Sequence, residues 1–354
     1  MNRSKLFELF PLIVLWGALE FAGGGCTAQS PEAGDNGEGT EVVAGVANLD
    51  STTGSNYFGC PYGTGTPPAQ LCDREFGECT LLANGIQGNV VNDLVVLPPE
   101  GDVAPPIGNL ALLTPNALFF VNMTTRIATP SGVAVGANPS ALVVSSNGRD
   151  LYVASSDAIR IVNIQSQRLV QTVTLPQGGG PSVNMCEVEA EDKLRVYYCG
   201  QSCGYFDNTG GANPPAAVPL ADQGSGPPVC AAGRVYKPFR NSVQVLDAAT
   251  ASLVIEIPLP QANRCYVSED GDCLYCTVPE GNNTTVVGFK TQDNTEFGRV
   301  RISGPNTFIR GSQTSRDIFI GTQNGITTCD RGLTDCKRQT ANLTRGATFV
   351  QFNR

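Results

Sequence analysis

Histidine is absent from the 354 residues, whereas cysteine occurs 13 times. Without imidazole there can be no Ser-His-Asp or Cys-His catalytic arrangement, and zinc and copper lose their usual nitrogen ligands. The remaining options are carboxylate, Lys, Tyr, calcium and disulfide chemistry. We predict no catalytic residue, no metal site and no cofactor, because the segments that could supply this chemistry are better explained as turns.

Two acidic segments are the main candidates for carboxylate or calcium chemistry. The denser one contains Glu187, Glu189, Glu191 and Asp192. The other, Ser-Glu-Asp-Gly-Asp at 268–272, resembles a fragment of a calcium loop but lacks the downstream bidentate Glu. Both align with the Ser-Ser-Asn-Gly turn at 145–148, so we interpret both as solvated turns.

The cysteines indicate an oxidising compartment, because no cytosolic zinc pattern accompanies them. If Cys26 is reserved for lipidation, an even set of 12 remains. Two segments share one pattern, CDREFGEC at 72–79 and CDRGLTDC at 329–336. In each, the two cysteines flank a predicted hairpin turn at a separation that a disulfide can bridge. We predict the bonds Cys72–Cys79 and Cys329–Cys336.

The motif Cys273-Leu-Tyr-Cys276 has the spacing of a redox-active pair. That chemistry favours a cysteine at a helix N-terminus, but this segment is typical of a strand, where residues three apart point to opposite faces. We therefore predict structural disulfides, with Cys265 bonded across a hairpin to one of the two and Cys276 assigned as its partner. Cys199 and Cys203 pair with each other or with Cys230, and the sequence leaves both options open.

A clear unit of secondary structure lies at 139–176, where apolar residues alternate in four short runs separated by turn residues. This period of two is typical of β-strands and hairpins. The whole chain has the composition expected of short strands and tight turns, with 40 Gly, 24 Pro and only 16% charged residues.

A polar residue after an apolar pair recurs where the third strand of each unit should end. The marks are Asp73, Asn122, Asn163, Asp207, Asp247, Lys290 and Asp330. Their spacings are 49, 41, 44, 40, 43 and 40 residues, the period of four-stranded propeller blades. We predict an all-β, seven-bladed β-propeller of four-stranded antiparallel blades. Six blades would follow if 208–229 were one long insertion.

The first blade lacks a strand at its amino end, while the chain finishes on an additional apolar strand at 347–352. We predict that this C-terminal strand pairs into the first blade. The ring would then close and lose its exposed edges.

The segments Asp150-Leu151-Tyr152-Val153, Ile161-Val162-Asn163 and Leu169-Val170 resemble the YVTN-type β-propeller repeat of bacterial and archaeal surface proteins. The resemblance covers roughly 110–346 and implies the fold. It implies little about activity, because the fold hosts binding proteins, scaffolds and enzymes alike.

The N-terminal region divides into two parts ahead of the propeller at 55–354. Residues 1–25 resemble a bacterial lipoprotein signal peptide, with a basic start, an apolar core and small residues before Cys26, the acylated residue of such signals. Ordinary cleavage and an uncleaved anchor are the alternatives. Residues 26–54 form an acidic, disordered tether. Thr27 and Ala28 follow Cys26, and with no Asp there the resemblance to lipoprotein signals favours the outer membrane. We therefore expect a lipid-anchored protein of the cell envelope, periplasmic or surface-exposed.

The charge balance excludes one class of partner. The net charge is −9 and there is no basic stripe, so the phosphate-neutralising surface that nucleic-acid binding requires is missing. We expect an envelope protein or a glycan as partner and the membrane only through the lipid.

In a propeller the innermost strands begin at the mouth of the central channel. The polar residues predicted there are Ser140, Ser182, Asn263, Arg264 and Asn306. They either cap turns or form a polar pocket in which Arg264 contacts an anion. Three long loops, 61–70, 208–229 and 278–285, are expected on the same face, where recognition usually resides.

Three functional hypotheses follow. The first is a non-enzymatic, lipid-anchored binding module for a protein or glycan. The second is a hydrolase or lyase of the propeller lactonase kind, which the YVTN resemblance permits but which needs two or more acidic or calcium-binding residues at the channel mouth. The third is a structural envelope protein that only spaces other components.

Overall fold

A computed structural model describes the chain from residue 55 onward, with gaps. The described residues are 55–59, 69–73, 79–81, 86, 91–97, 109–122, 125–176, 180, 182–190, 192–211, 213–221, 226–268, 270–311, 317–322, 325–339 and 349–351. They form strands and turns, and none of them forms a helix. Accordingly, this part of the chain contains no helix of the length and apolarity that a membrane span requires. The predicted signal peptide, Cys26 and the predicted tether lie outside the described residues.

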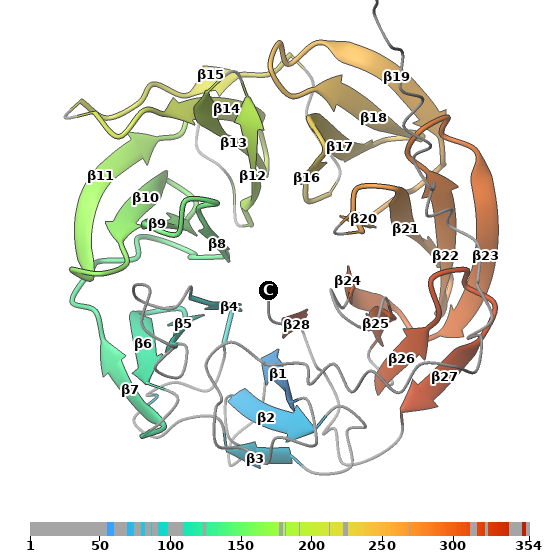
Figure 1. Ribbon diagram of the computed structural model, residues 1–354, viewed down its shortest axis with the longest axis horizontal. Coiled ribbons are helices and arrows are strands. Elements are labelled where there is room, and N and C mark those ends of the chain that lie inside the picture. The colour runs from blue at the N-terminus through green and yellow to red at the C-terminus, as the bar shows by residue number, and fades with distance from the viewer. Residues whose placement is uncertain are drawn as a thin grey trace, which may run out of the picture.

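Six four-stranded antiparallel sheets are each built from consecutive strands and are named blades 2 to 7 (Figure 1). Blade 2 comprises β4 (Asp93–Val96), β5 (Asn109–Leu113), β6 (Leu118–Asn122) and β7 (Ile127–Pro130). Blade 3 comprises β8 (Ala141–Val144), β9 (Asp150–Ala154), β10 (Ala158–Asn163) and β11 (Arg168–Thr174). Blade 4 comprises β12 (Asn184–Ala190), β13 (Lys193–Cys199), β14 (Cys203–Asn208) and β15 (Val218–Pro219).

The remaining three blades of consecutive strands complete this set. Blade 5 comprises β16 (Val229–Ala231), β17 (Arg234–Phe239), β18 (Ser242–Asp247) and β19 (Leu253–Pro258). Blade 6 comprises β20 (Arg264–Val267), β21 (Cys273–Glu280), β22 (Asn283–Lys290) and β23 (Glu296–Ser303). Blade 7 comprises β24 (Asn306–Gly311), β25 (Ile318–Thr322), β26 (Gly325–Cys329) and β27 (Cys336–Gln339).

A seventh sheet, blade 1, joins the two ends of the chain. Its strands are β1 (Ser55–Gly59), β2 (Ala69–Asp73), β3 (Cys79–Leu81) and β28 (Phe349–Gln351). The C-terminal strand β28 pairs antiparallel with β1 and takes the innermost position of the order β28-β1-β2-β3. The prediction of a propeller with four-stranded antiparallel blades, closed by the C-terminal strand, is therefore confirmed.

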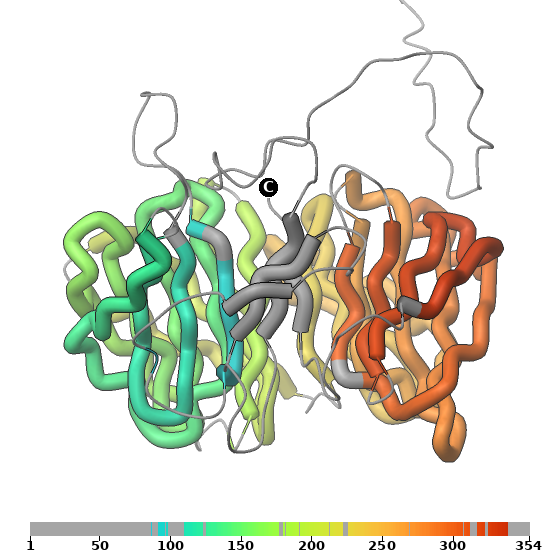
Figure 2. Tube along the Cα trace, turned by 90° about the horizontal axis from the view of Figure 1, so that it is seen from below, coloured from blue at the N-terminus to red at the C-terminus, as the bar shows by residue number. Residues whose placement is uncertain are grey.

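The ring has two distinct faces because every blade repeats the same up-and-down order (Figure 2). All inner strands begin at one face, which we call the mouth face. The turns after the first and third strands lie on the opposite face, which we call the hairpin face. The core lies between neighbouring blades, as in the cluster of Tyr152, Phe206 and Met185 between blades 3 and 4.

The recurring polar mark caps the turn between the third and fourth strands. Oδ1 of Asp247 accepts hydrogen bonds from the backbone N–H groups of Ala249 and Thr250, at 3.2 and 3.0 Å. Asn163 and Asp330 accept equivalent bonds in blades 3 and 7. Asp and Asn recur at this position because their short side chains can satisfy turn backbone groups that lack strand partners.

The two acidic segments were both predicted to be solvated turns, and the first of them differs from that prediction. The turns at 145–149 and 268–272 are alike, with Gly148 and Gly271 at φ 70° and 76° and a Ser hydroxyl bonded to the side chain two residues on. However, β12 extends to Ala190, so Glu187 and Glu189 lie on the inner strand of blade 4 and not in a solvated turn. Glu187 is half-buried and its Oε1 accepts the N–H of Ser146 at 2.6 Å.

Four disulfides join described cysteines, and two of them were predicted. Cys329–Cys336 and Cys265–Cys276 both cross a hairpin, as expected. Of the two options for Cys199, the structure has the bond to Cys203. The fourth bond, Cys186–Cys230, links the inner strands β12 and β16 of neighbouring blades.

The other cysteine predictions concern Cys273 and the pair Cys72 and Cys79. Cys273 is also disulfide-bonded, so Cys273 and Cys276 are not bonded to each other. The strand register places Cys72 opposite Cys79. Their side chains lie outside the described part of the chain, and that bond stays a prediction.

Candidate functional site

The five residues expected at the channel mouth all lie at or just before the start of an inner strand. Asn306 and Arg264 are the first residues of β24 and β20, and Asn263 directly precedes β20. Ser140 directly precedes β8, and Ser182 lies two residues before β12. All five therefore belong to the mouth face, although different blades carry them. Their role in ligand binding stays a prediction.

Ser140 and Asn306 make hydrogen bonds to other groups of the protein. Oγ of Ser140 donates to the carbonyl of Val183 at 2.6 Å and accepts the N–H of the same residue at 2.9 Å, which ties β8 to the start of β12. Asn306 accepts from the Thr277 hydroxyl at 3.2 Å and donates to the carbonyls of Phe308 and Gly321. Both side chains fix the spacing of neighbouring strands at the mouth face.

Arg264 differs from these residues because one nitrogen of its guanidinium is buried without a partner. Its Nε is inaccessible to solvent and makes no hydrogen bond with any residue that the structure describes. Burial lowers the pKa of Arg264, and the positive charge of Arg310 on the neighbouring strand β24 lowers it further. A desolvated cation beside a second cation is costly unless an anion lies close to it.

Two residues that complete this charge cluster were not predicted from the sequence. Arg310 is exposed and lies close enough to affect the pKa of both Arg264 and Asp93. Asp93 is the first residue of β4, and its carboxylate accepts the N–H groups of Leu94 at 2.9 Å and Leu142 at 2.7 Å. Burial raises the pKa of Asp93 to about 6, although both hydrogen bonds and Arg310 act to lower it.

A sequence signal existed for Asp93 but not for Arg310. Asp93-Leu-Val-Val aligns with Ala141-Leu-Val-Val at the start of the next inner strand, so the repeat phase places Asp93 at the mouth face. Arg310 lies near the end of its strand, four residues after Asn306. Its long side chain reaches the charge cluster only because the ring brings blades 2, 6 and 7 around one channel.

The expected mouth-face loops are only partly where they were predicted. The segment 208–229 is divided by β15, which pairs with β14 as the fourth strand of blade 4, so its first half leaves from the hairpin face. The segment 278–285 is not a loop, because β21 and β22 extend through it and turn at 281–282. Most of 61–70 lies outside the described residues.

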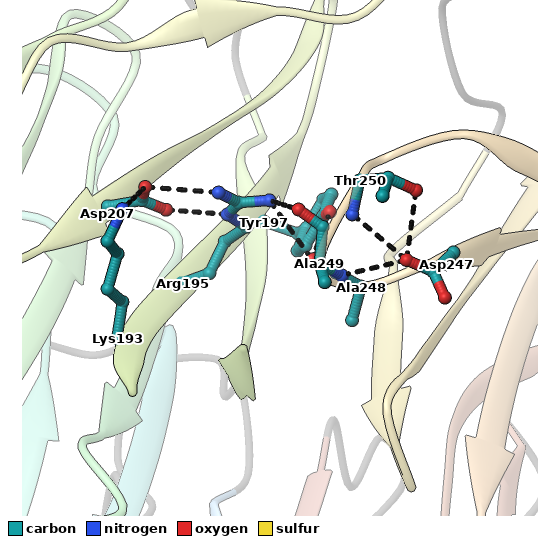
Figure 3. Close-up of polar contacts among 8 residues, drawn as sticks. All are labelled: Lys193, Arg195, Tyr197, Asp207, Asp247, Ala248, Ala249 and Thr250. Carbon is teal, nitrogen blue, oxygen red and sulfur yellow. Dashed lines mark hydrogen bonds and ion pairs between the residues drawn. The ribbon is translucent and has the colours of Figure 1, made fainter. Parts of the chain in front are cut away.

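A second charge cluster lies between blades 4 and 5 and is shown in Figure 3. Nε and Nη2 of Arg195 donate to the two carboxylate oxygens of Asp207, at 2.6 and 3.1 Å. Nη1 donates to the carbonyls of Ala248 and Ala249 in the next blade. The hydrogen bond with Asp207 raises the pKa of Arg195, and the bond with Arg195 lowers the pKa of Asp207. Every nitrogen of the guanidinium donates to an acceptor within the protein, so we interpret this cluster as structural.

Tyrosines of the second strands make a related contact between blades. The Tyr197 hydroxyl donates to the carbonyl of Ala248 at 2.9 Å, and the Tyr275 hydroxyl donates to that of Arg331 at 2.8 Å. The Tyr152 hydroxyl accepts from Nδ2 of Asn208 at 2.8 Å. In each case the partner is the residue that follows the polar mark of the next blade. These tyrosines therefore hold neighbouring blades in register.

No family profile matches this chain, and no curated protein matches it. Solved structures are similar in fold. A candidate 6-phosphogluconolactonase from Bacteroides uniformis ATCC 8492 is 14% identical, with a TM-score of 0.61, over 85% of this chain and 99% of that one. Another, from Bacteroides fragilis NCTC 9343, is 15% identical, with a TM-score of 0.60, over 85% of this chain and 98% of that one. These similarities show the β-propeller fold, and the YVTN assignment stays a prediction.

The chemistry of the mouth face follows from these side chains. Arg264 and Arg310 supply positive charge, and Asp93 lies close enough to Arg310 for that charge to lower its pKa. Within the same residues, no group of three or more Cys, Asp or Glu side chains is placed to hold a metal ion. The arrangement is suited to binding an anionic group.

Proposed function

We propose that this chain is a non-enzymatic, lipid-anchored protein of the cell envelope whose propeller binds an anionic group of a protein or glycan partner at the channel mouth. The observation that carries this proposal is the buried Nε of Arg264, which has no partner among the described residues. A carboxylate or sulfate on the partner would compensate this charge with charge-assisted hydrogen bonds to the guanidinium. Arg310 would add a second positive charge to the same anion.

The anchor is the other part of the proposal. Cys26, acylated after removal of residues 1–25, would hold the propeller at the outer membrane, with 26–54 as the tether. Radiolabelled palmitate should be incorporated into the wild-type protein and not into Cys26→Ala. Equal incorporation into both would exclude a lipid on Cys26.

The binding site is tested with two anionic probes, an oligogalacturonate and a Glu-rich peptide, by fluorescence anisotropy on the full chain. We expect at least one probe to bind and Arg264→Met to weaken it roughly tenfold or more, because a charge-assisted hydrogen bond is lost. Arg168→Met, an exposed arginine on β11, serves as control and should bind normally. Binding should also weaken as salt rises. Equal binding by all three proteins, or none at all, would overturn the proposal.

A lactonase-like hydrolase is the second candidate, and one observation favours it. Asp93, with a pKa of about 6, has the perturbed carboxylate expected of a general acid or base, and the fold resembles candidate lactonases. Its two oxygens already accept backbone N–H groups, which favours a structural role. Hydrolysis of 6-phosphogluconolactone by the wild type, abolished in Asp93→Asn, would replace the binding-module proposal. A purely structural scaffold would show neither binding nor hydrolysis.

A further inference from the structure

A cavity of about 390 Å³ opens on the hairpin face between blades 3 and 4, at the opposite face of the ring from the channel mouth. The turn before β9 and the end of β10 form one wall, and the start of β13 and the end of β14 form the other. Residues that line it include Asn147, Arg149, Asp150, Val170, Lys193 and Asn208. Its volume falls in the range of small-molecule sites.

The charges around the cavity are balanced. Arg149 and Lys193 are positive, whereas Asp150 and Asp192 are negative. Neither sign is in excess, so the lining attracts no ionic ligand in preference to a neutral one. This distinguishes the cavity from the arginine pair at the channel mouth.

Several polar groups of the lining have hydrogen-bonding capacity that the described protein does not use. Oδ2 of Asp150 accepts from Nδ2 of Asn208 at 3.2 Å, which leaves Oδ1 available as an acceptor. Oδ1 of Asn147 accepts from Ser145 and from the N–H of Arg149, which leaves its NH₂ group as a donor. The exposed guanidinium of Arg149 makes no side-chain bond with a described residue. Donors and acceptors on one wall suit hydroxyl groups, which can do both.

The lining also contains apolar side chains, and its rim is held in place. Ile161, Val170 and Leu194 contribute aliphatic surface. The rim beyond them is fixed by Gln171, whose Nε2 donates to the carbonyls of Gly211 and Asn213. Because both walls are built by strands and a bonded rim, the cavity exists before any ligand arrives. The geometry points to a binding site for a neutral carbohydrate, with its hydroxyls on Asp150, Asn147 and Arg149 and its ring against the aliphatic side chains of the lining. The site does not depend on the proposed anion site at the channel mouth.

The test places a large side chain in the cavity and, as a control, the same side chain at the equivalent exposed position of another blade. Val170 is 55% exposed, and Val254, at the same repeat position in blade 5, is 49% exposed. Saturation-transfer NMR on the full chain would use a panel of neutral methyl glycosides. We expect at least one to bind with a dissociation constant of about 1 mM or tighter. Val170→Trp should abolish the signal, whereas Val254→Trp should retain it.

Two further comparisons decide the chemistry of the ligand. Arg149→Ala should weaken the bound glycoside about fivefold, as expected for one exposed hydrogen bond, and Arg168→Ala should not. Glucuronate and glucosamine should bind no more tightly than the matching neutral sugar. The proposal is wrong if no neutral glycoside binds, if Val170→Trp binds normally, or if a charged sugar binds best.

Discussion

Arg195 and Arg264 are both withdrawn from solvent, but their surroundings are opposite. Arg195, between blades 4 and 5, donates to Asp207 and to two carbonyls of the neighbouring blade. Arg264, at the channel mouth, has a buried Nε with no partner among the described residues and a second arginine nearby. The hydrogen bond with Asp207 raises the pKa of Arg195, whereas burial lowers that of Arg264.

This difference distinguishes polar groups that hold the blades together from polar groups that a ligand can bind. Between blades 4 and 5, polar groups pair with groups of the next blade and so fix the ring. At the channel mouth, Ser140 and Asn306 do the same for neighbouring strands, and Arg264 alone of the five predicted residues has a buried polar atom left unsatisfied. Buried polar groups are normally satisfied, so an exception marks a site where a ligand can supply the missing partner.

The largest effect should come from the disulfide at the structural interface. Cys186–Cys230 closes a chain segment of 44 residues, whereas Cys199–Cys203 closes one of 4. The chain-entropy relation gives about 4 kcal/mol for the longer loop and about 2 kcal/mol for the shorter. Urea unfolding of the two double Cys→Ala variants should therefore differ by about 2 kcal/mol. Equal losses would mean that the link between blades adds nothing beyond a local hairpin bond.

Arg195→Met should lower the free energy of unfolding by about 3 kcal/mol, because it leaves the Asp207 carboxylate without its partner. The matched control is Arg234→Met, since the ion pair of Arg234 with Asp247 is exposed and should contribute little to stability. Urea unfolding measures both. If the two variants lost equal stability, the cluster in Figure 3 would not be the clamp between blades 4 and 5 that its geometry indicates.

Asp93, at the channel mouth, should make the stability of the protein depend on pH. Its pKa is about 6 in the folded protein and 3.8 for an unperturbed Asp, so the folded state holds a proton that the unfolded state releases between these values. The stability from protonated Asp93 is fully present below pH 3.8 and is lost as pH rises through 6. The free energy of unfolding of the wild type, relative to that of Asp93→Asn, should fall by about 2 kcal/mol as pH rises over this range, with allowance for partial exposure. A constant difference across urea titrations would show that Asp93 titrates normally.

The strand order was predictable because its signals are local. Asp or Asn ends most of the third strands and caps the turn that follows, so one polar position marks the blade period. The bond Cys329–Cys336 follows in the same way from two residues that face each other in one hairpin. Such features depend on neighbours in sequence, and the sequence shows them directly.

The contacts between blades were not predictable by the same means. Tyr152 and Asn208 are 56 residues apart, and their contact exists only after the ring has set the rotation of one blade against the next. Cys186 and Cys230 lie on inner strands of different blades, so no hairpin pattern connects them. Arg310 joins the charge cluster through the length of its side chain, a property that strand phase does not encode.

The smallest stability effect should come from Arg264→Met, and its sign tests the comparison with Arg195 most directly. Removal of an unpartnered buried cation costs no hydrogen bond and relieves desolvation, so stability should stay unchanged or rise by about 1 kcal/mol. The same substitution at Arg195 should cost about 3 kcal/mol. Urea unfolding and anion binding must be measured on the same preparation, because a functional arginine predicts retained stability with lost binding. A loss of stability comparable to that of Arg195→Met would mean that Arg264 is structural, and none of the five predicted residues would then remain as an unsatisfied candidate for ligand binding.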